Sequence, residues 1–513
     1  MNKIYSKLLG IVFISAVLLS CTDDLERLPT NGLSSDDNFS TFEGYTQGLS
    51  SIYNLGNNNG KSWDGGLVRK YSILQEAPTD EAVVYWNTIT ESRWAADYGD
   101  IAYMYGNLVK SITFANNFIN EAEPGLVASR GFSGAEAVAI ASYVSETRFL
   151  RAWYYWMLLD LFGNPPFPNE NQLKKAEIPE QIASADLFAY IESELKAIEG
   201  ELVTPGSNVY GRIDQAAAWG LLSRLYLNAE VYTGQAYNTQ SITYSKKVID
   251  AGYSLESNYE WLTIGDNHLC TNEMIFSIPF NSDETLVETW EGTNYLVLGA
   301  SGIPEGMNGI SGSWGLYAFK PQMIDKFPSE DNSIDKRAMI YTEDRTKEIS
   351  SIHDSSQGFS GYKFNNLNRA GEAFRAGNPS ALSDVDFPVI RLGEIYLNYA
   401  EAVLRGGTGG SETDVLMYVN NIRERAYGNT NGNIDAAALN LEFILDERAR
   451  ELYWECHRRT DLVRFGKFTS SDYVWAWKGG IEEGIGIPEH MNIYPMPSSD
   501  VLANPNLEQN TGY

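Results

Sequence analysis

The clearest pattern in the chain is a run of apolar residues three and four positions apart over residues 141–162. Residues with this spacing lie on one face of an α-helix. The positions on this face are Val144, Thr147, Leu150, Tyr154, Met157 or Leu158, and Leu161. Gly163-Asn164-Pro165-Pro166 follows, and glycine and proline end helices. The sequence therefore predicts a helix over 141–162 that buries one face.

Six further helices are predicted from the same kind of spacing, and most of them come in pairs joined by short loops. Their ranges are 184–199, 213–230, 241–250, 391–405, 412–427 and 441–458. Ser184 is a candidate N-cap for the first of them. Small and large residues alternate over residues 216–226 as they do in tetratricopeptide helices, which stack in pairs. These patterns predict a scaffold of helical hairpins.

The pattern changes over residues 255–390, where Gly, Ser, Asn and Pro become frequent and aromatic residues are scattered among them. The apolar run Met274 to Phe280 predicts a short strand there. No hydrophilic linker divides the chain. We therefore expect a mainly α fold, with tetratricopeptide-like helical hairpins, irregular loops and a few short strands, as one large domain over 38–513. Loops on such a scaffold are where binding residues tend to lie.

The N-terminus has the features of a bacterial lipoprotein signal. Lys3 and Lys7 precede an uncharged apolar run over residues 8–20, which is too short to span a bilayer comfortably and is typical of a secretory signal peptide. The run ends Leu18-Leu19-Ser20-Cys21, which resembles a lipobox. We expect a signal peptide over 1–20, lipidation of Cys21, and a polar tether over 21–37. Asp23 and Asp24 resemble a surface-export signal, which predicts a cell outer membrane location facing outwards.

Composition and charge exclude some classes of partner. The chain has 38 Lys and Arg against 67 Asp and Glu, a net charge of −29. Binding to phosphate backbones needs a positive field, so we expect no nucleic-acid partner. The negative charge also favours a neutral ligand over an anionic one.

Motifs for catalysis, cofactors and metals are incomplete. Gly56-Asn57-Asn58-Asn59-Gly60-Lys61-Ser62 is one residue short of a phosphate-binding loop. Three cysteines and four histidines show no zinc spacing. We therefore predict no enzyme, no catalytic residue, no cofactor and no metal site. A glycoside hydrolase needs only two suitably placed carboxylates, so this class stays open as an alternative.

Four stretches together resemble the SusD/RagB family of outer-membrane lipoproteins. They are Thr147-Arg148-Phe149-Leu150-Arg151-Ala152-Trp153-Tyr154-Tyr155 with Leu161-Phe162-Gly163; residues 387–402; Leu445-Asp446-Glu447-Arg448-Ala449-Arg450-Glu451-Leu452 with residues 461–467; and the chain end, residues 504–513. They occur in family order behind the lipobox. One departure is Asn164-Pro165-Pro166-Phe167, where the family usually has a shorter turn.

The resemblance implies a function. Members of this family bind glycans at the cell surface and deliver them to a partner SusC-like TonB-dependent transporter. We therefore expect a lipid-anchored protein that captures a neutral polysaccharide or oligosaccharide. A peptide-capturing RagB-type protein and a scaffold without a ligand remain alternatives.

Charged residues within these motifs lie on otherwise apolar helices. Buried charges need partners, and the motifs supply both signs. We expect ion pairs between helices rather than catalysis. The residues concerned are Arg148, Arg151, Arg391, Glu394, Glu401, Glu447, Arg450 and Glu451.

Aromatic residues in loops are the candidates for sugar binding. The apolar face of a pyranose ring stacks on an exposed aromatic ring, while planar polar groups bind its hydroxyls. Tryptophans within predicted helices are expected to pack in the core. Loop tryptophans are better candidates, and family members place sugar contacts after a Thr-Asp-Glu segment (here Thr79-Asp80-Glu81) and before an Asp-Lys-Arg segment (here 335–337). The candidate ligand-binding residues are Trp86, Asn87, Arg93, Trp94, Trp290, Tyr295, Trp314 and Tyr317.

Overall fold

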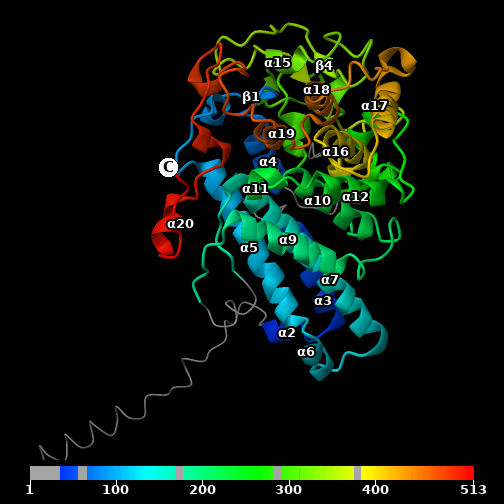
Figure 1. The fold of residues 1–513 in the computed structure, drawn as a ribbon, viewed down its shortest axis with the longest axis vertical. Helices are drawn as coiled ribbons and strands as arrows, with labels where there is room; N and C mark the ends of the chain where they lie inside the picture. Colours follow the sequence, from blue (N-terminus) through cyan, green and yellow to red (C-terminus); the bar gives the residue numbers. More distant parts are fainter. Residues whose placement is uncertain (1–34, 56–65, 169–176, 282–291, 311, 375–382) are drawn as a thin grey trace, which may run out of the picture.

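Long helices form one end of the molecule, and loops with short strands form the other (Figure 1). The computed structural model describes residues 35–55, 66–168, 177–281, 292–310, 312–374 and 383–513. One continuous apolar cluster runs from Phe39 to Leu507 and joins both ends. The predicted mainly α class with few short strands is confirmed.

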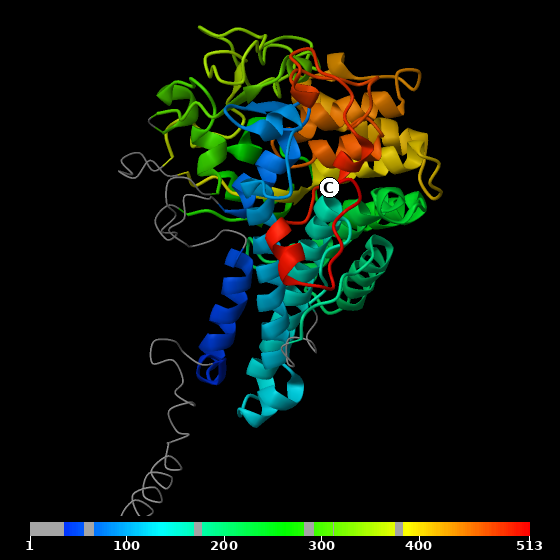
Figure 2. The ribbon, with the colours of Figure 1, turned by 90° about the vertical axis from the view of Figure 1, so that its left-hand side faces the viewer.

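The N-terminal helices form a bundle in which α3, α5 and α7 lie side by side (Figure 2). The helices are α2 (Ser35–Asn38), α3 (Phe42–Leu55), α4 (Leu67–Glu76), α5 (Gly99–Glu121), α6 (Pro124–Ser129) and α7 (Gly134–Phe162). Helices α3, α4 and α5 were not predicted from the sequence. Helix α2 begins inside the stretch predicted as a tether.

Helix α7 is the central helix of the bundle. It begins seven residues before the predicted start, because its first turns are mostly exposed and carry little apolar pattern. From Ser145 onwards nearly every residue is buried, on all sides of the helix, as expected of a helix surrounded by protein. It ends at Phe162, as predicted, and Gly163 follows with φ +71°.

Helical hairpins continue across the middle of the molecule. The helices are α9 (Ser184–Ile198), α10 (Gln215–Leu227), α11 (Ala229–Thr233) and α12 (Asn238–Ile249). Helix α10 packs on α12, and α12 packs on α16 (Leu392–Leu404). Gly220 allows the close approach of α10 to the strand behind it, because a Cβ there would lie 2.7 Å from Ile390 Cγ2.

Two predicted boundaries in this region were wrong. The helix expected over 213–230 breaks at Asn228, whose side chain bonds Arg224 O and Arg464. The predicted cap Ser184 is the first residue of α9, and the Asn164 side chain accepts its backbone N–H at 2.8 Å.

The strands in the described part of the chain form three antiparallel pairs. They are β1 (Ala82–Val84) with β3 (Tyr317–Phe319), β2 (Met274–Ile278) with β6 (Phe387–Arg391), and β4 (Ile340–Tyr341) with β5 (Ser360–Gly361). The strand predicted from Met274 is therefore confirmed. Short helices connect these strands: η2 (Thr88–Glu91), η3 (Tyr259–Thr263), η4 (Asn267–Leu269), α13 (Asn294–Leu298), α14 (Glu305–Asn308) and α15 (Pro321–Ile324).

The C-terminal helices close the loop-rich end. They are α16, α17 (Glu412–Tyr427), η5 (Thr430–Gly432), α18 (Leu441–Leu452), α19 (Arg458–Arg464), η6 (Lys478–Gly480), η7 (Glu489–Asn492) and α20 (Ser498–Ala503). The helix predicted over 441–458 ends at Leu452. Trp454 and Cys456 have positive φ, and the Glu81 and Glu76 carboxylates accept their backbone N–H groups. Contacts distant in sequence therefore end this helix.

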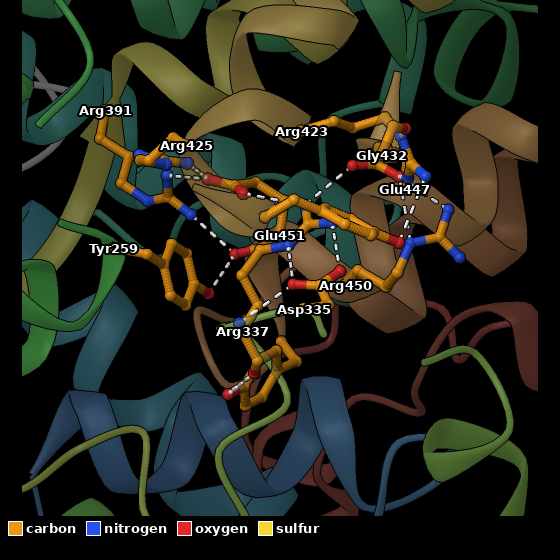
Figure 3. Close-up of polar contacts among 12 residues, drawn as sticks. Tyr259, Asp335, Arg337, Arg391, Arg423, Arg425, Gly432, Glu447, Arg450 and Glu451 are labelled. Atoms are coloured by element: carbon orange, nitrogen blue, oxygen red, sulfur yellow. Dashed lines mark hydrogen bonds and ion pairs between the residues drawn. The ribbon is translucent and has the colours of Figure 1, made fainter. Parts of the chain in front are cut away.

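A buried charge network joins these helices to β6 (Figure 3). The Glu451 carboxylate accepts hydrogen bonds from Arg391 at 2.6 Å and from Arg337 at 3.2 Å. Glu447 binds Arg337 at 2.8 Å and Arg450 at 2.7 Å. The predicted ion pairing of the helix charges is confirmed, since Arg148 and Arg151 bind Glu194, Glu394 binds Arg224, and Glu401 binds Arg464.

The predicted signal peptide and lipidated Cys21 lie outside the described residues. Within the described ranges, no helix combines the length and the hydrophobicity needed to cross a bilayer.

Candidate functional site

The β1–β3 pair brings two loop tryptophans to the same end of one ladder. Val84 pairs with Tyr317, and the next residue, Tyr85, donates its N–H to Leu316 O at 2.8 Å. Trp86 follows β1 and Trp314 precedes β3. Because the strands are antiparallel, both residues leave the ladder at the same end.

Trp86 is held in an exposed and strained position. Its side chain is 56% exposed, which makes it the one exposed tryptophan in the described part of the chain. Its φ is +55°, in the left-handed region, which is a genuine outlier for a bulky residue. Its backbone N–H donates to Ile352 O at 2.9 Å. Strain of this kind persists where surrounding structure fixes it, and it clusters at binding sites.

A polar loop over residues 345–358 forms the rim beside Trp86. The Arg345 guanidinium donates to the carbonyls of Ser355 at 2.8 Å and Gln357 at 2.7 Å. The Gln357 side chain accepts the N–H groups of Ser350 and Ser351. The loop is therefore tied to itself and, through Ile352, to Trp86. This loop was not predicted from the sequence, because a Ser- and Asp-rich segment carries no periodic signal.

Asn87 has a structural role in this arrangement. Its Oδ1 accepts the N–H of Ile89 at 3.0 Å, which caps η2, and also accepts the Tyr98 hydroxyl. Its Nδ2 donates to Asp100 at 3.3 Å. The amide is thus engaged by the protein, and we leave it out of the proposed binding surface.

Arg93 and Trp94 line a hollow beside the C-terminal residues, and Trp86 does not belong to its lining. This hollow has a volume of about 560 Å³. Trp94 Nε1 donates to the Tyr513 hydroxyl at 2.8 Å, and the Trp94 ring lies 4.9 Å from that of Tyr494. The Arg93 side chain is largely exposed and lies 3.8 Å from Glu91. Trp86 and the Arg93–Trp94 pair, which are close in sequence, therefore belong to separate surfaces.

Tyr295 and Tyr317 are buried in the core. Their rings lie 5.3 Å apart, and Tyr317 also packs edge-on against Trp454 at 4.7 Å. The Tyr317 hydroxyl donates to Leu296 O. Their exposed fractions are 3% and 2%, so neither offers a ring face to a ligand here. Trp290 lies outside the described residues.

Carboxyls with raised pKa values are candidates for acid catalysis, and two such carboxyls, which precede β1 in the chain, are buried. Burial raises the pKa of Glu81 to about 8, and burial with the nearby Glu81 charge raises that of Glu76. Both side chains accept backbone N–H groups beneath β1 rather than facing solvent. Among the described residues, no group of three or more His, Cys, Asp or Glu is placed to hold a metal ion.

Comparison with known proteins gives consistent matches. A family model described as the SusD family matches residues 341–513. The starch-binding protein SusD of Bacteroides thetaiotaomicron is 31% identical, over 98% of this chain and 97% of its own length. A SusD-like protein of Bacteroides ovatus is 22% identical, over 90% and 83%.

Solved structures share the fold. A SusD superfamily protein from Parabacteroides distasonis superposes with a TM-score of 0.72 at 21% identity, covering 94% of this chain and 100% of that one. Surface glycan-binding protein A from Bacteroides thetaiotaomicron, in complex with laminarihexaose, gives a TM-score of 0.70 at 18% identity, covering 91% and 99%.

Proposed function

Because this chain belongs to the SusD family, we propose that it is a cell-surface glycan-binding lipoprotein that passes captured polysaccharide or oligosaccharide to a TonB-dependent outer-membrane transporter. Lipidation of Cys21 would anchor it in the outer membrane. The transporter is a proposal from family membership, as is the absence of catalysis.

The observation that carries the binding role is the exposed, strained Trp86 at the same ladder end as Trp314. A solvent-exposed indole that is already held rigidly loses little conformational entropy when a ligand binds. Its ring face can stack on the apolar face of a sugar ring. The tied loop over 345–358, which accepts the Trp86 N–H through Ile352 O, would form the edge of the platform. Trp314 is half-buried and would extend the platform.

Starch is the first glycan to test, because a relative that aligns with 98% of this chain is named for starch binding. Laminarin is the second, since a structural neighbour is named for it. We expect soluble protein beginning at Thr22 to be retarded in native gels containing amylopectin or laminarin. The same mixtures should release no new reducing ends.

Three outcomes would separate the rival classes. Release of reducing ends would make the protein a hydrolase. Binding of oligopeptides in place of glycans would assign the peptide-capturing role. The absence of a co-purifying barrel protein in detergent extracts would contradict the delivery role alone.

A further inference from the structure

A hollow of about 440 Å³ lies between η3, α14 and the turn that follows β5. This volume is within the range of small-molecule sites, about 300–1,000 Å³. Its lining includes Glu260, Trp261, Met307, Asn332, Tyr362 and Arg369. None of these residues belongs to the β1–β3 ladder or to the loop beside Trp86.

Four polar groups of this lining have no protein partner. They are the Glu260 carboxylate, the Trp261 indole N–H, the Asn332 amide and the Tyr362 hydroxyl. Each of them makes no side-chain hydrogen bond to any other residue in the described ranges. The four residues are partly exposed, so these groups face solvent in the free protein and are available to a polar ligand that displaces water.

The rest of the lining is held in place. The Arg369 guanidinium stacks over the Trp261 ring at 4.5 Å and donates to Cys270 Sγ at 3.3 Å. The Asn365 amide closes the turn beneath, accepting from Leu367 N at 3.1 Å and donating to Tyr362 O at 3.2 Å. The walls are thus organised before a ligand arrives, which lowers the entropic cost of binding.

We propose that this hollow is a second carbohydrate subsite, which binds a neutral sugar unit of the same glycan. Sugar hydroxyls both donate and accept hydrogen bonds. The Asn332 amide and the Tyr362 hydroxyl can do both, the Glu260 carboxylate accepts, and the Trp261 indole N–H donates. Met307 and the Trp261 edge supply apolar contact. The lining carries one anionic and one cationic side chain, Glu260 and Arg369, so its charges are balanced, which suits a neutral sugar.

This inference rests on the proposed glycan binding and extends it to long polymers. A polymer held at Trp86 would reach the second subsite at a raised effective concentration. The subsite should therefore contribute more to the binding of polysaccharide than to that of short oligosaccharide.

The test uses Tyr362→Phe and Asn332→Ala in soluble protein, with Ile334→Ala as the control. Tyr362→Phe removes a hydroxyl without a protein partner, so its melting temperature should equal that of wild type. Ile334 is exposed on the loop that carries Asn332 and does not line the hollow. We expect both subsite variants to weaken amylopectin or laminarin retention by about three- to tenfold, the effect of losing one hydrogen bond. The control should bind as wild type does.

Hydrogen exchange with maltoheptaose or laminarihexaose provides the independent readout. Amides of residues 258–263 and 362–371 should be protected in wild type and in Trp86→Ala. Protection confined to the region around Trp86, with unchanged retention of Tyr362→Phe, would overturn the second subsite and leave the proposed function intact. Absence of binding to every glycan would contradict both.

Discussion

Trp86 is the residue on which the binding account depends. An L-residue in the left-handed region costs about 1–2 kcal/mol, and a large ring left in water gains nothing from burial. Neither feature helps this chain to fold. The backbone bond to Ile352 and the ladder through Tyr85 maintain the conformation despite that cost, which is expected when the ring serves a ligand.

Two substitutions of Trp86 should affect glycan affinity equally but the free energy of unfolding differently. Trp86→Gly and Trp86→Ala both remove the ring, and both should weaken glycan binding by about 1–3 kcal/mol. Glycine adopts φ +55° without strain, so Trp86→Gly should be more stable than Trp86→Ala by about 1 kcal/mol. Titration calorimetry and urea unfolding measure the two effects. A glycine variant less stable than the alanine variant would refute the strain argument.

The candidate tyrosines show the limit of sequence reasoning at this scale. Tyr317 lies three residues from Trp314 in a loop-like stretch, and nothing in their sequence context separates them. The structure assigns Tyr317 to β3, where Trp454 covers its ring. Burial of a loop aromatic depends on partners far away in sequence, and those partners cannot be read from its neighbours.

At the scale of elements, the loop over 345–358 positions the site without belonging to the scaffold. Arg345 holds it through the carbonyls of Ser355, Gln357 and Gly358. The proposed sugar-facing edge therefore depends on the Arg345 guanidinium, which itself need not touch the ligand.

Arg345→Ala should loosen this loop and weaken binding indirectly. Faster amide exchange is expected over 350–358, together with a several-fold weaker affinity and a stability loss of about 1–3 kcal/mol. Lys347→Ala is the matched control, because Lys347 pairs only with exposed carboxylates of Asp325 and Glu330. Unchanged exchange in Arg345→Ala would remove the positioning role.

Helices whose ends are set locally were predicted well. Residues 412–427 match α17 at both ends, because Ser411 caps its first turn and Gly428 follows with φ +69°. The helix predicted to reach residue 458 failed, because Glu76 and Glu81 stabilise a turn at 453–456. Strand β1 has three residues, too few for any periodicity. The helical scaffold was therefore readable, whereas the ladder that positions Trp86 was not.

At the scale of the whole molecule, the buried charges tie α17, α18 and β6 together. Burial acts to raise the pKa of Glu451, but Arg425, Arg391 and Arg337 outweigh it and lower the pKa to about 2. In Glu394 the Arg224 charge likewise overcomes burial and lowers the pKa to about 2. These carboxyls are charged in the folded state at neutral pH.

Acid should unfold the protein in a defined window. A carboxyl with a depressed folded pKa stabilises the fold above its unfolded pKa of 4.5, and this contribution is lost as the pH falls towards 2. We expect the free energy of unfolding to fall steeply between these pH values. Chemical denaturation at a series of pH values measures it, and a flat profile would contradict the account.

Removing the charge of Glu451, at the centre of the network, should lower the free energy of unfolding. Glu451→Gln leaves buried guanidinium groups without their shared carboxylate, and we expect a loss of about 3–5 kcal/mol. Glu442→Gln on the same helix is the control, because its exposed pair with Lys467 contributes about 1 kcal/mol or less. Equal effects of the two substitutions in urea unfolding would refute the structural role.

The proposed anchor predicts where the protein is found in cells. Cys21→Ser should release it from the membrane fraction, since acyl chains supply the stable attachment. Replacing Asp23 and Asp24 with Ala should instead retain membrane attachment and reduce antibody labelling on intact cells. Fractionation and surface labelling distinguish the two effects. A Cys21→Ser protein that stays in the membrane fraction would exclude the lipid anchor.

The most direct test of the central claim compares wild type, Trp86→Phe and Trp86→Ala in native gels containing amylopectin or laminarin. Leu502→Ala serves as the control, because Leu502 is an exposed apolar residue on α20. We expect wild type and the control to be retarded by at least one glycan, Trp86→Phe to be retarded less, and Trp86→Ala to be retarded least. Retardation of Trp86→Ala equal to that of wild type would contradict the account.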